Sequence, residues 1–416
     1  MNISPAAQQL CRILSFDPQD RTGLDSVTPG DWQPMLNLAL QQNLAPLLYQ
    51  HIQVLGMCDA VPAEVLISLR NQYLHNAARA MGLVRQFETI LAGLNSAHIP
   101  IIPIKGIYLV QMIYNNASLR NMSDIDILLQ SHDVARAVEI FHTLGYQPVR
   151  PYNLRNEFKF HRHLPAFSKS GSIPVEVHNA LQQPSDPFNI DLAALWSRAG
   201  EIRLGNHTVN SLHPHDLLLY LCINLAFHDL FRLGLRGLYD LGAVIAHFQS
   251  DLDWDELYQR SLAWRANRLV YITLSLAHVL LGANVPAEFL ARLTPPHFDE
   301  AVFSICTDFI FSNTNQGNTV VTPELDRLIK SPSFLEKSKI FLSRLFVSRW
   351  EMANYYKVRP DSLKIYWCYL LRLIYLARSY ITTGMNLSRG DPDLLAISNQ
   401  VGYQDHLQKV LRENLI

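Results

Sequence analysis

The spacing of apolar residues changes twice along this chain, and that change restricts its fold more than any other feature. Up to about residue 97, apolar side chains recur every three to four residues, which predicts helices. Residues 99–181 contain short β-branched runs that predict strands, and helical spacing returns from about residue 190. We therefore expect an α+β fold, with N-terminal helices over 1–97, a small mixed-sheet core over 98–190 and a large all-helical region over 191–416.

Short segments make up the expected α/β core. The run IPIIPIKG (99–106) predicts a strand and a turn, and its two prolines favour an edge position. A short helix (107–114) and a second strand, IDILL (125–129), are expected next. The runs FKFHRHLPAFSKS (158–170) and IPVEVHNAL (173–181) predict a β-hairpin.

Composition excludes several classes of protein and partner. Of 416 residues, 49% are hydrophobic and 17% charged, which is too apolar for a disordered chain and indicates a large core. Lys plus Arg (35) nearly balance Asp plus Glu (36), so the net charge is −1. Such a chain has no strong field for a long nucleic acid or an anionic membrane, and we expect neither as a partner.

Cysteine usage and hydropathy indicate the compartment. The five cysteines are odd in number and form no C-x-x-C pair, which argues against a zinc ribbon or a disulfide framework. The uncharged run between Arg268 and Glu288 contains polar residues, so we expect a buried helix there and no membrane span. The N-terminus lacks the features of a signal peptide. The expected location is the cytoplasm.

An acidic pair on the second predicted strand is the strongest candidate site. Because side chains alternate along a strand, Ile125 and Ile127 can face the core while Asp124 and Asp126 share the other face, about 7 Å apart. Two such carboxylates repel unless a cation lies between them, and their oxygens suit Mg²⁺. The alternative is a solvated strand face, since about three acidic-x-acidic pairs are expected by chance in this composition.

The same spacing recurs at Asp251, Asp253 and Asp255. We interpret these residues as a loop and a helix start, where acids interact favourably with the helix dipole. The cluster lacks the glycine and the distal glutamate of a calcium-binding loop.

A third carboxylate can join the first two. In the predicted strand IPVEVH, Val175 and Val177 share one face, and Glu176 shares the other with His178. Glu176 could therefore complete a metal site beside the aspartates. The alternative is a salt bridge on an edge strand.

Basic residues near the acids suggest a phosphate site. Lys105 and Gly106 end one strand and open a helix, where backbone amides attract phosphate and Lys105 would add a positive charge. Arg120 could add a forked contact. The order of these residues before the acidic strand is the informative feature.

Together these residues form the string I-K-G-(x)13-R-(x)3-D-I-D-I-L, followed by H-L-P and V-E-V-H, over Ile104 to His178. This string resembles the uncharacterised nucleotidyltransferase family of bacteria (the NTP_transf_5 group), within the polymerase-β-like nucleotidyltransferase superfamily. The resemblance covers roughly residues 65–245. The chain has Lys105-Gly106 where the wider superfamily usually has Gly-Ser or Gly-Gly, and the subfamily shares this departure.

The resemblance implies a transferase that uses Mg²⁺, or Mn²⁺ in its place, and a nucleoside triphosphate such as ATP. Asp124, Asp126 and Glu176 match the catalytic, metal-binding acids, and Gly106 matches the turn. Two metals would clamp the attacking hydroxyl and the departing pyrophosphate in an in-line displacement. A nucleoside monophosphate would then pass to a hydroxyl or similar group of a small molecule, peptide or protein.

Two alternatives use the same residues. The chain could be a non-catalytic nucleotide-binding or scaffold protein that keeps the fold, or a phosphotransferase or nucleotide hydrolase. No P-loop, nucleophile elbow, H-E-x-x-H motif or dinucleotide-binding glycine motif occurs in a useful context.

Some polar residues admit both a functional and a structural interpretation. His163, in H-L-P, and His178 could contact phosphate or acceptor, or could be hydrogen-bonded structural residues. For Asp229 we prefer the role of a helix cap. Arg236 and Asp240 are four residues apart on a predicted helix and are expected to pair.

The C-terminal region offers one further feature. Aromatic residues at helical spacing between 366 and 375 favour a packed helix or a homo-oligomer interface over a surface that stacks on nucleic acid. A polar stretch at 312–324 predicts a loop or linker.

Overall fold

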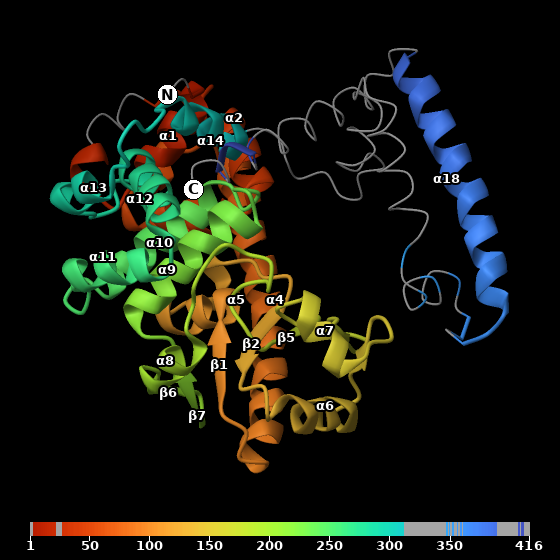
Figure 1. Cartoon of the computed structure of the whole chain (residues 1–416). Helices are drawn as coiled ribbons and strands as arrows, with labels where there is room; N and C mark the ends of the chain where they lie inside the picture. The colour runs from red at the N-terminus through yellow and green to blue at the C-terminus, as the bar shows by residue number, and fades with distance from the viewer. Residues whose placement is uncertain are drawn as a thin grey trace. The chain divides into compact units, whose positions relative to one another are not determined.

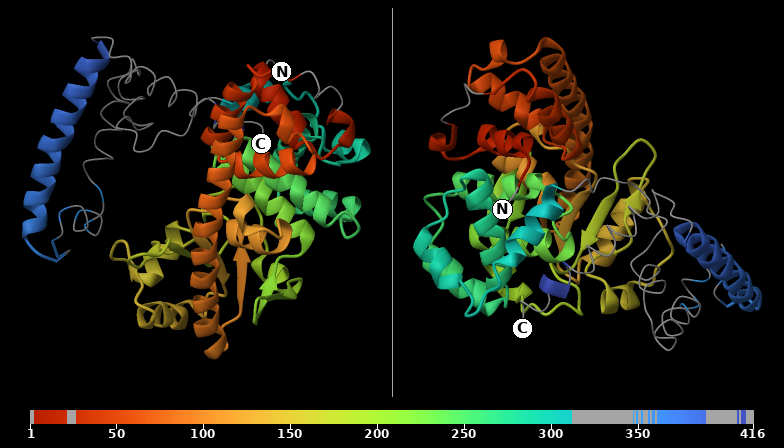
Figure 2. Two further views of the ribbon diagram at one scale, coloured as in Figure 1. Left: turned by 180° about the vertical axis from the view of Figure 1, so that it is seen from behind. Right: turned by 90° about the horizontal axis from the view of Figure 1, so that it is seen from above.

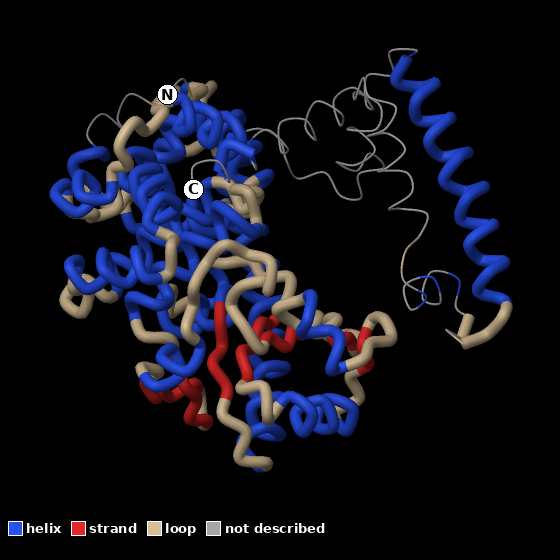
Figure 3. The backbone as a smooth tube through the Cα atoms, in the orientation of Figure 1, coloured by secondary structure: helices blue, strands red, loops and turns tan. Residues whose placement is uncertain are grey.

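The computed structural model describes residues 3–21, 27–311 and 361–388, together with single positions in 347–359 and 407–411. The chain divides into two compact units, residues 1–313 with 411–416 and residues 314–410. The predicted segments 1–97 and 98–190 both lie in the first unit, and the predicted loop at 312–324 falls outside the described residues. In the first unit a small mixed sheet is flanked by helices, which confirms the α+β prediction (Figures 1 and 3).

Helices form the N-terminal region, as the apolar spacing predicts. The first begins after Ser4, whose hydroxyl accepts a hydrogen bond from the Ala7 amide at 3.2 Å. The long helix α4 has 34 residues and therefore extends about 50 Å, from the other N-terminal helices to the sheet (Figure 2). These helices are α1 (Pro5–Leu14), α2 (Trp32–Gln41), α3 (Ala45–Val54) and α4 (Ala63–Ser96).

A five-stranded mixed sheet follows, in the order β1-β2-β5-β4-β3. β1 is antiparallel to β2, β2 is parallel to β5, and β4 is antiparallel to both β5 and β3. β1 contains Pro103 and lies at the edge, which confirms the position predicted from its prolines. The strands are β1 (Ile101–Ile104), β2 (Ile125–Leu129), β3 (Gln147–Pro148), β4 (Phe167–Ser168) and β5 (Val175–His178).

Alternation along these strands separates the core from the candidate site. One face of the sheet packs with α4 and α6 (Val134–Thr143) in a buried apolar cluster. The strand residues of that cluster include Ile101, Ile125, Ile127, Leu129, Val175 and Val177. Because neighbouring side chains on a strand point to opposite faces, Asp126, Glu176 and His178 lie on the other side of the sheet.

The predicted hairpin is only partly correct. β4 and β5 form it, but residues 158–160 belong to a helix, α7 (Leu154–Phe160). A short apolar run fits either structure, and tertiary packing decides. The predicted helix over 107–114 is α5 (Lys105–Tyr108), continued by a π-helical turn, η4 (Leu109–Ile113). A 3-10 turn, η5 (Ala117–Leu119), precedes β2.

A second, two-stranded sheet of β6 (Gly200–Leu204) and β7 (His207–Ser211) follows, which the sequence patterns did not predict. Beyond it helices dominate again. The uncharged run after Arg268 forms α12, which is buried along most of its length, as predicted. None of the described helices combines the length and apolar character needed to cross a bilayer. The helices are α8 (Leu192–Ser197), α9 (Pro214–Ile223), η6 (Asn224–His228, π-helical), α10 (Leu235–His247), α11 (Trp254–Ala263), α12 (Asn267–Leu281), α13 (Ala287–Leu293) and α14 (Ala301–Phe311).

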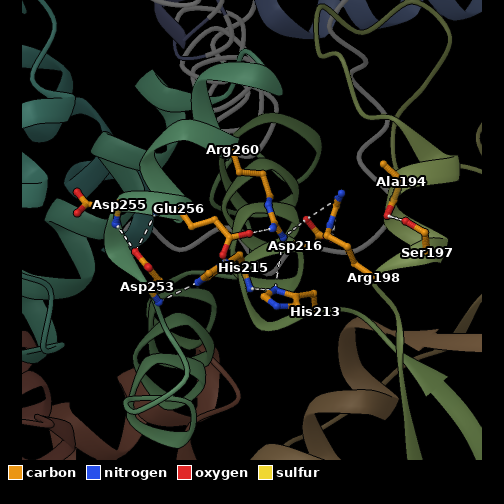
Figure 4. A network of polar contacts seen from close by, with 10 residues as sticks. All are labelled: Ala194, Ser197, Arg198, His213, His215, Asp216, Asp253, Asp255, Glu256 and Arg260. Atoms are coloured by element: carbon orange, nitrogen blue, oxygen red, sulfur yellow. Dashed lines mark hydrogen bonds and ion pairs between the residues drawn. The ribbon is translucent and has the colours of Figure 1, made fainter.

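Buried charge in this helical layer is paired. Asp216 of α9 is completely buried, and its carboxylate forms ion pairs with Arg198 at 3.0 Å and with Arg260 of α11 at 2.8 Å (Figure 4). Asp253 caps α11 and accepts hydrogen bonds from the amides of Asp255 (2.9 Å) and Glu256 (3.0 Å). The interpretation of the acids at 251–255 as a helix start is confirmed.

The second unit is described mainly by α18 (Lys364–Ser388). Ile365 and Cys368 pack with Met352 in a small apolar cluster. Aromatic residues of the predicted stripe are instead largely exposed, at 61% for Tyr366 and 63% for Trp367. In the whole chain all five cysteines are free thiols, in line with the prediction of no disulfide framework.

Candidate active site

The turn between β1 and α5 brings a lysine to the polar face of the sheet. Lys105 follows Ile104 directly and has a left-handed backbone (φ +52°), which is strained in a residue other than glycine. Gly106 comes next, and a Cβ there would lie 2.8 Å from Arg120 Nη1 and 3.2 Å from Met122 Cγ. A side chain at position 106 would displace Arg120 and Met122, so the close approach of these two residues favours glycine.

β2 and β5 carry two of the predicted acids side by side. Asp126 and Glu176 are register partners on these parallel strands, so their side chains leave the same face of the sheet. His178 joins them, with its Nε2 2.9 Å from Asp126 Oδ1 and 3.4 Å from Glu176 Oε2. Lys105 Nζ donates to the same Asp126 oxygen at 2.7 Å. The structure thus brings two acids, a lysine and a histidine of the predicted site together.

Opposing effects set the charge of these groups. Burial raises the pKa of Asp126, which is 2% exposed, but the charge of Lys105 and the hydrogen bond from His178 outweigh burial and lower it overall. Burial also raises the pKa of Glu176, whereas the hydrogen bond from His178 leaves it lowered. The pKa of Lys105 is raised, because nearby Tyr220 and Asp126 outweigh the effect of burial. Both acids are therefore ionised, and the lysine protonated, at neutral pH.

Asp124 has a different environment from Asp126. It directly precedes β2, and its carboxylate accepts a hydrogen bond from Ser123 Oγ at 3.3 Å. Burial and the negative charge of Asp126 raise the pKa of Asp124 to about 6. It forms no ion pair with any residue that the structure describes. A cation beside it would relieve the repulsion between the two carboxylates.

A cavity of about 210 Å³ lies beside these residues. Five of the residues predicted from the sequence line it: Lys105, Gly106, Arg120, Asp124 and Asp126. His178, on β5, contacts both Asp126 and Glu176. Neither Glu176 nor His178 is among the described residues that line this cavity.

Arg120 is held by a residue far away in the sequence. Its Nε and Nη2 donate to the carboxylate of Asp240 on α10 at 2.9 and 2.8 Å, and Tyr114 donates to the same carboxylate at 2.7 Å. Asp240 thus pairs with Arg120. The prediction that Asp240 pairs with Arg236, four residues earlier on the same helix, is wrong. Burial lowers the pKa of Arg120, but Asp240 raises it overall, so the guanidinium stays charged.

His163 lies beside His178 rather than in the acidic cluster. The two residues form a β-bridge, and their ring centroids are 5.0 Å apart. The Nδ1 of His163 is 2.8 Å from the carbonyl oxygen of Leu164, so it is the donor. Burial and the neighbouring His178 lower the pKa of His163, which favours the neutral ring.

The sequence patterns did not assign several residues that line the cavity to the candidate site. Asn224 of η6, Asp229 at its C-terminal cap and Arg236 of α10 line the same cavity as Asp124 and Asp126. Asp229 takes the C-terminal cap position of η6, as predicted, and also faces the cavity. One signal was available, since Asn224 is a polar residue within the apolar run LLLYLCINLAF. A π-helical turn at such a residue often marks a functional site.

The donor atoms fit a hard divalent cation. One ligand atom from each of Asp126, Glu176 and His178 lies within 4.8 Å of the others. Lys105 and His178 both bind Oδ1 of Asp126, which leaves Oδ2 as the oxygen that can face a cation. Carboxylate oxygens of this kind suit Mg²⁺ or Mn²⁺.

Comparison with known proteins finds one matching family and one similar solved structure. A family model described as an uncharacterised nucleotidyltransferase matches residues 28–282, more than half of the chain and every candidate residue above. The solution structure of the antibiotic-resistance factor ANT(2'')-Ia is similar at 12% identity, over 47% of this chain and 96% of that chain, with a TM-score of 0.31. No curated protein matches the chain.

Proposed function

Because the chain belongs to the uncharacterised nucleotidyltransferase family, we propose that it transfers a nucleoside monophosphate from a nucleoside triphosphate to an acceptor. The observation that carries this proposal is Asp126 opposite Glu176 on paired parallel strands, with Lys105 bound to Asp126. These groups supply a cation site next to a turn suited to phosphate. The acceptor is a small molecule, peptide or protein with a free hydroxyl or similar group.

The acids are the proposed metal ligands. Asp124, Asp126 and Glu176 would hold Mg²⁺, for which Mn²⁺ can substitute. When bound, the metal would neutralise charge on the attacking oxygen and the departing pyrophosphate. His178 keeps Glu176 and Asp126 ionised through its hydrogen bonds, which supports a role in positioning them.

The basic residues are the proposed contacts to the triphosphate. Lys105 lies at the strand–helix turn, where its ammonium group forms an ion pair with Asp126. A bound triphosphate would be a second anionic partner for this ammonium group. Gly106 lets the backbone come close to the phosphates. Arg120 uses Nε and Nη2 on Asp240, so Nη1, which points toward Gly106, is the group left for phosphate. His163, beside His178, is a proposed contact at the edge of the site.

The chemistry is an in-line displacement at the α-phosphorus. The acceptor oxygen forms a bond to this phosphorus, the bond from phosphorus to the bridging oxygen breaks, and pyrophosphate leaves with the electron pair. The hydroxyl proton passes to a carboxylate, for which Glu176 is the proposed first recipient. The nearly neutral chain supports a compact substrate in place of a long nucleic acid, and its free thiols support a reducing cytoplasm.

The test is an incubation of the full chain with each labelled nucleoside triphosphate, Mg²⁺ or Mn²⁺, and fractionated small molecules and proteins as acceptors. Pyrophosphate release and an acceptor heavier by one nucleoside monophosphate are expected. Asp126→Ala should abolish both. Asp253→Ala is the matched control, since it removes an acid of the same spacing far from this site.

Product analysis separates the alternatives. Release of a nucleoside diphosphate with a phosphorylated acceptor would mean phosphotransfer, and nucleotide products without an acceptor would mean hydrolysis. Tight nucleotide binding with no turnover over the whole acceptor set would favour a scaffold protein. Transfer that survives in Asp126→Ala would place the site elsewhere.

A further inference from the structure

One wall of the cavity, formed by Asn224, Asp229 and Arg236, has buried polar atoms without hydrogen-bond partners. The Nδ2 of Asn224 donates to Asp229 Oδ2 at 2.5 Å, but its Oδ1 is buried and has no hydrogen-bond partner. Asn224 is only 5% exposed and lines the cavity. A buried amide oxygen without a donor is costly, so it indicates a ligand that brings one.

The charges around the cavity point to the same kind of ligand. Four carboxylates line it, and two of them are neutralised, Asp126 by Lys105 at 2.7 Å and Asp240 by Arg120 at 2.8 Å. Among the described residues, Asp229 has no partner in an ion pair. Its backbone carbonyl, not its carboxylate, accepts from Arg232 Nε at 3.1 Å.

Arg236 is the other charged group on this wall. Its Nη1 donates to the carbonyl oxygen of Asn121 at 3.0 Å, which holds the guanidinium against the loop before β2. Its Nε is buried without a hydrogen-bond partner. The wall therefore offers acceptors at Asn224 and Asp229 and one donor at Arg236.

We propose that this wall is the acceptor subsite, and that it recognises a protonated amine whose N–H groups donate to the Asp229 carboxylate and to Asn224 Oδ1. An oxygen of the same compound, such as a hydroxyl, accepts from Arg236 Nε. The subsite shares one cavity with Asp124 and Asp126, so an amine bound there can present its neighbouring hydroxyl to the metal-binding acids. This inference rests on the proposed nucleotidyl transfer and names its substrate class.

A second metal ion fits the wall less well than an amine. Of the three wall residues only Asp229 and Asn224 carry oxygen ligands, and Asp229 Oδ2 already accepts a hydrogen bond from Asn224 Nδ2. Burial raises the pKa of Asp229 by more than the nearby cations Lys105 and Arg162 lower it. An ammonium group would supply the missing positive charge and fill both acceptors through separate N–H groups.

The experiment uses matched pairs of acceptors that differ in one group. Glucosamine and glucose form one pair, and 2-aminoethanol and ethylene glycol form another. Pyrophosphate release by the full chain is measured with Mg²⁺ and each nucleoside triphosphate in turn. We expect kcat/KM at least tenfold higher for the amines than for their hydroxyl counterparts.

Variants then test the assigned residues. Asp229→Asn should raise KM for the amine about 10- to 100-fold, with kcat and the KM for the nucleotide changed less than threefold. Asn224→Ala should raise the same KM about 3- to 10-fold. Asp251→Asn, the same substitution at an exposed position, should match the wild type. Thermal melts of each variant check that the fold is kept.

The outcomes separate this inference from the proposed function. Equal use of amines and their hydroxyl counterparts, or discrimination that persists in Asp229→Asn and Asn224→Ala, would overturn the amine subsite. Those results together with loss of pyrophosphate release in Asp126→Ala would leave nucleotidyl transfer intact. Absence of nucleotide binding and turnover in the wild type would overturn the proposed function itself.

Discussion

Asp124 and Asp126 share their spacing with Asp253 and Asp255, yet the two pairs have different neighbours. Asp253 caps a helix and accepts two backbone amides, and Asp255 lies at the surface, where it is paired with Arg292. Asp124 and Asp126 lie at the start of a buried strand, beside Lys105 and a cavity. Asp253 stabilises a helix end, and Asp255 forms a surface ion pair. Asp124 and Asp126 instead place two carboxylates side by side without stabilising a helix end or a turn.

Buried carboxylates elsewhere show the same contrast. Two arginines from outside α9 neutralise the charge of Asp216, so its carboxylate needs no positively charged ligand (Figure 4). Asp124 and Asp229 have no such partner among the described residues. Half-buried carboxylates without an ion-pair partner therefore distinguish the candidate site from the helical layer better than the acidic motif does.

The largest effect is expected from Asp126→Ala. It removes the carboxylate that Lys105 and His178 share, and we expect kcat/KM for nucleotidyl transfer to fall at least about 10³-fold, or about 4 kcal/mol. Asp253→Ala should leave kcat/KM within about twofold of the wild type. Pyrophosphate release measures both, and more than a tenth of wild-type activity in Asp126→Ala would contradict the site.

Asp216→Asn should cause the largest loss of stability. It leaves Arg198 and Arg260 close together without their shared anion, and we expect the free energy of unfolding to fall by about 3 kcal/mol. Urea denaturation measures this change. Activity per folded molecule should stay the same, and a selective loss of activity would show that the network serves the site.

Asp124→Asn should have the opposite effect on stability. The pKa of Asp124 is about 6 in the folded chain against an ordinary value of 3.8, so its ionisation opposes folding above pH 6 and does not below about pH 4. The variant should therefore be more stable than the wild type at pH 7.5, by about 1–2 kcal/mol after allowance for partial exposure. This gain should shrink by pH 4.5.

Magnesium provides the control for that variant. Mg²⁺ should raise the melting temperature of the wild type at pH 7.5 and should have a smaller effect on Asp124→Asn. Equal shifts in both proteins would remove Asp124 from the metal site.

The smallest effect on stability is expected when the cap of α11, Asp253, is removed. Asp253→Ala removes the acceptor for two amides of α11, and a lost cap typically costs about 1 kcal/mol of stability. Denaturation at neutral pH measures it. A loss as large as that of Asp216→Asn would mean that Asp253 has a further role in the network shown in Figure 4.

The sequence predicted those parts of the site that depend on local patterns. β2 has the predicted bounds, and Lys105, Gly106, Asp124 and Asp126 line one cavity because strand alternation and turn chemistry act over a few residues. The pairing of Asp240 was predicted wrongly. Spacing on a helix cannot reveal that Arg120, 120 residues earlier in the chain, competes for the same carboxylate.

The sequence by itself determined an α+β fold, the edge strand, the polar face of β2 and a resemblance to one family, because periodicity and motif order are local properties. Only the tertiary structure decided which buried charges are neutralised. It paired Arg120 with Asp240, held Asp216 between two arginines, and placed Asn224 and Asp229 in the same cavity as Asp124. Charge compensation depends on distances between elements that are far apart in the chain, and packing alone sets those distances.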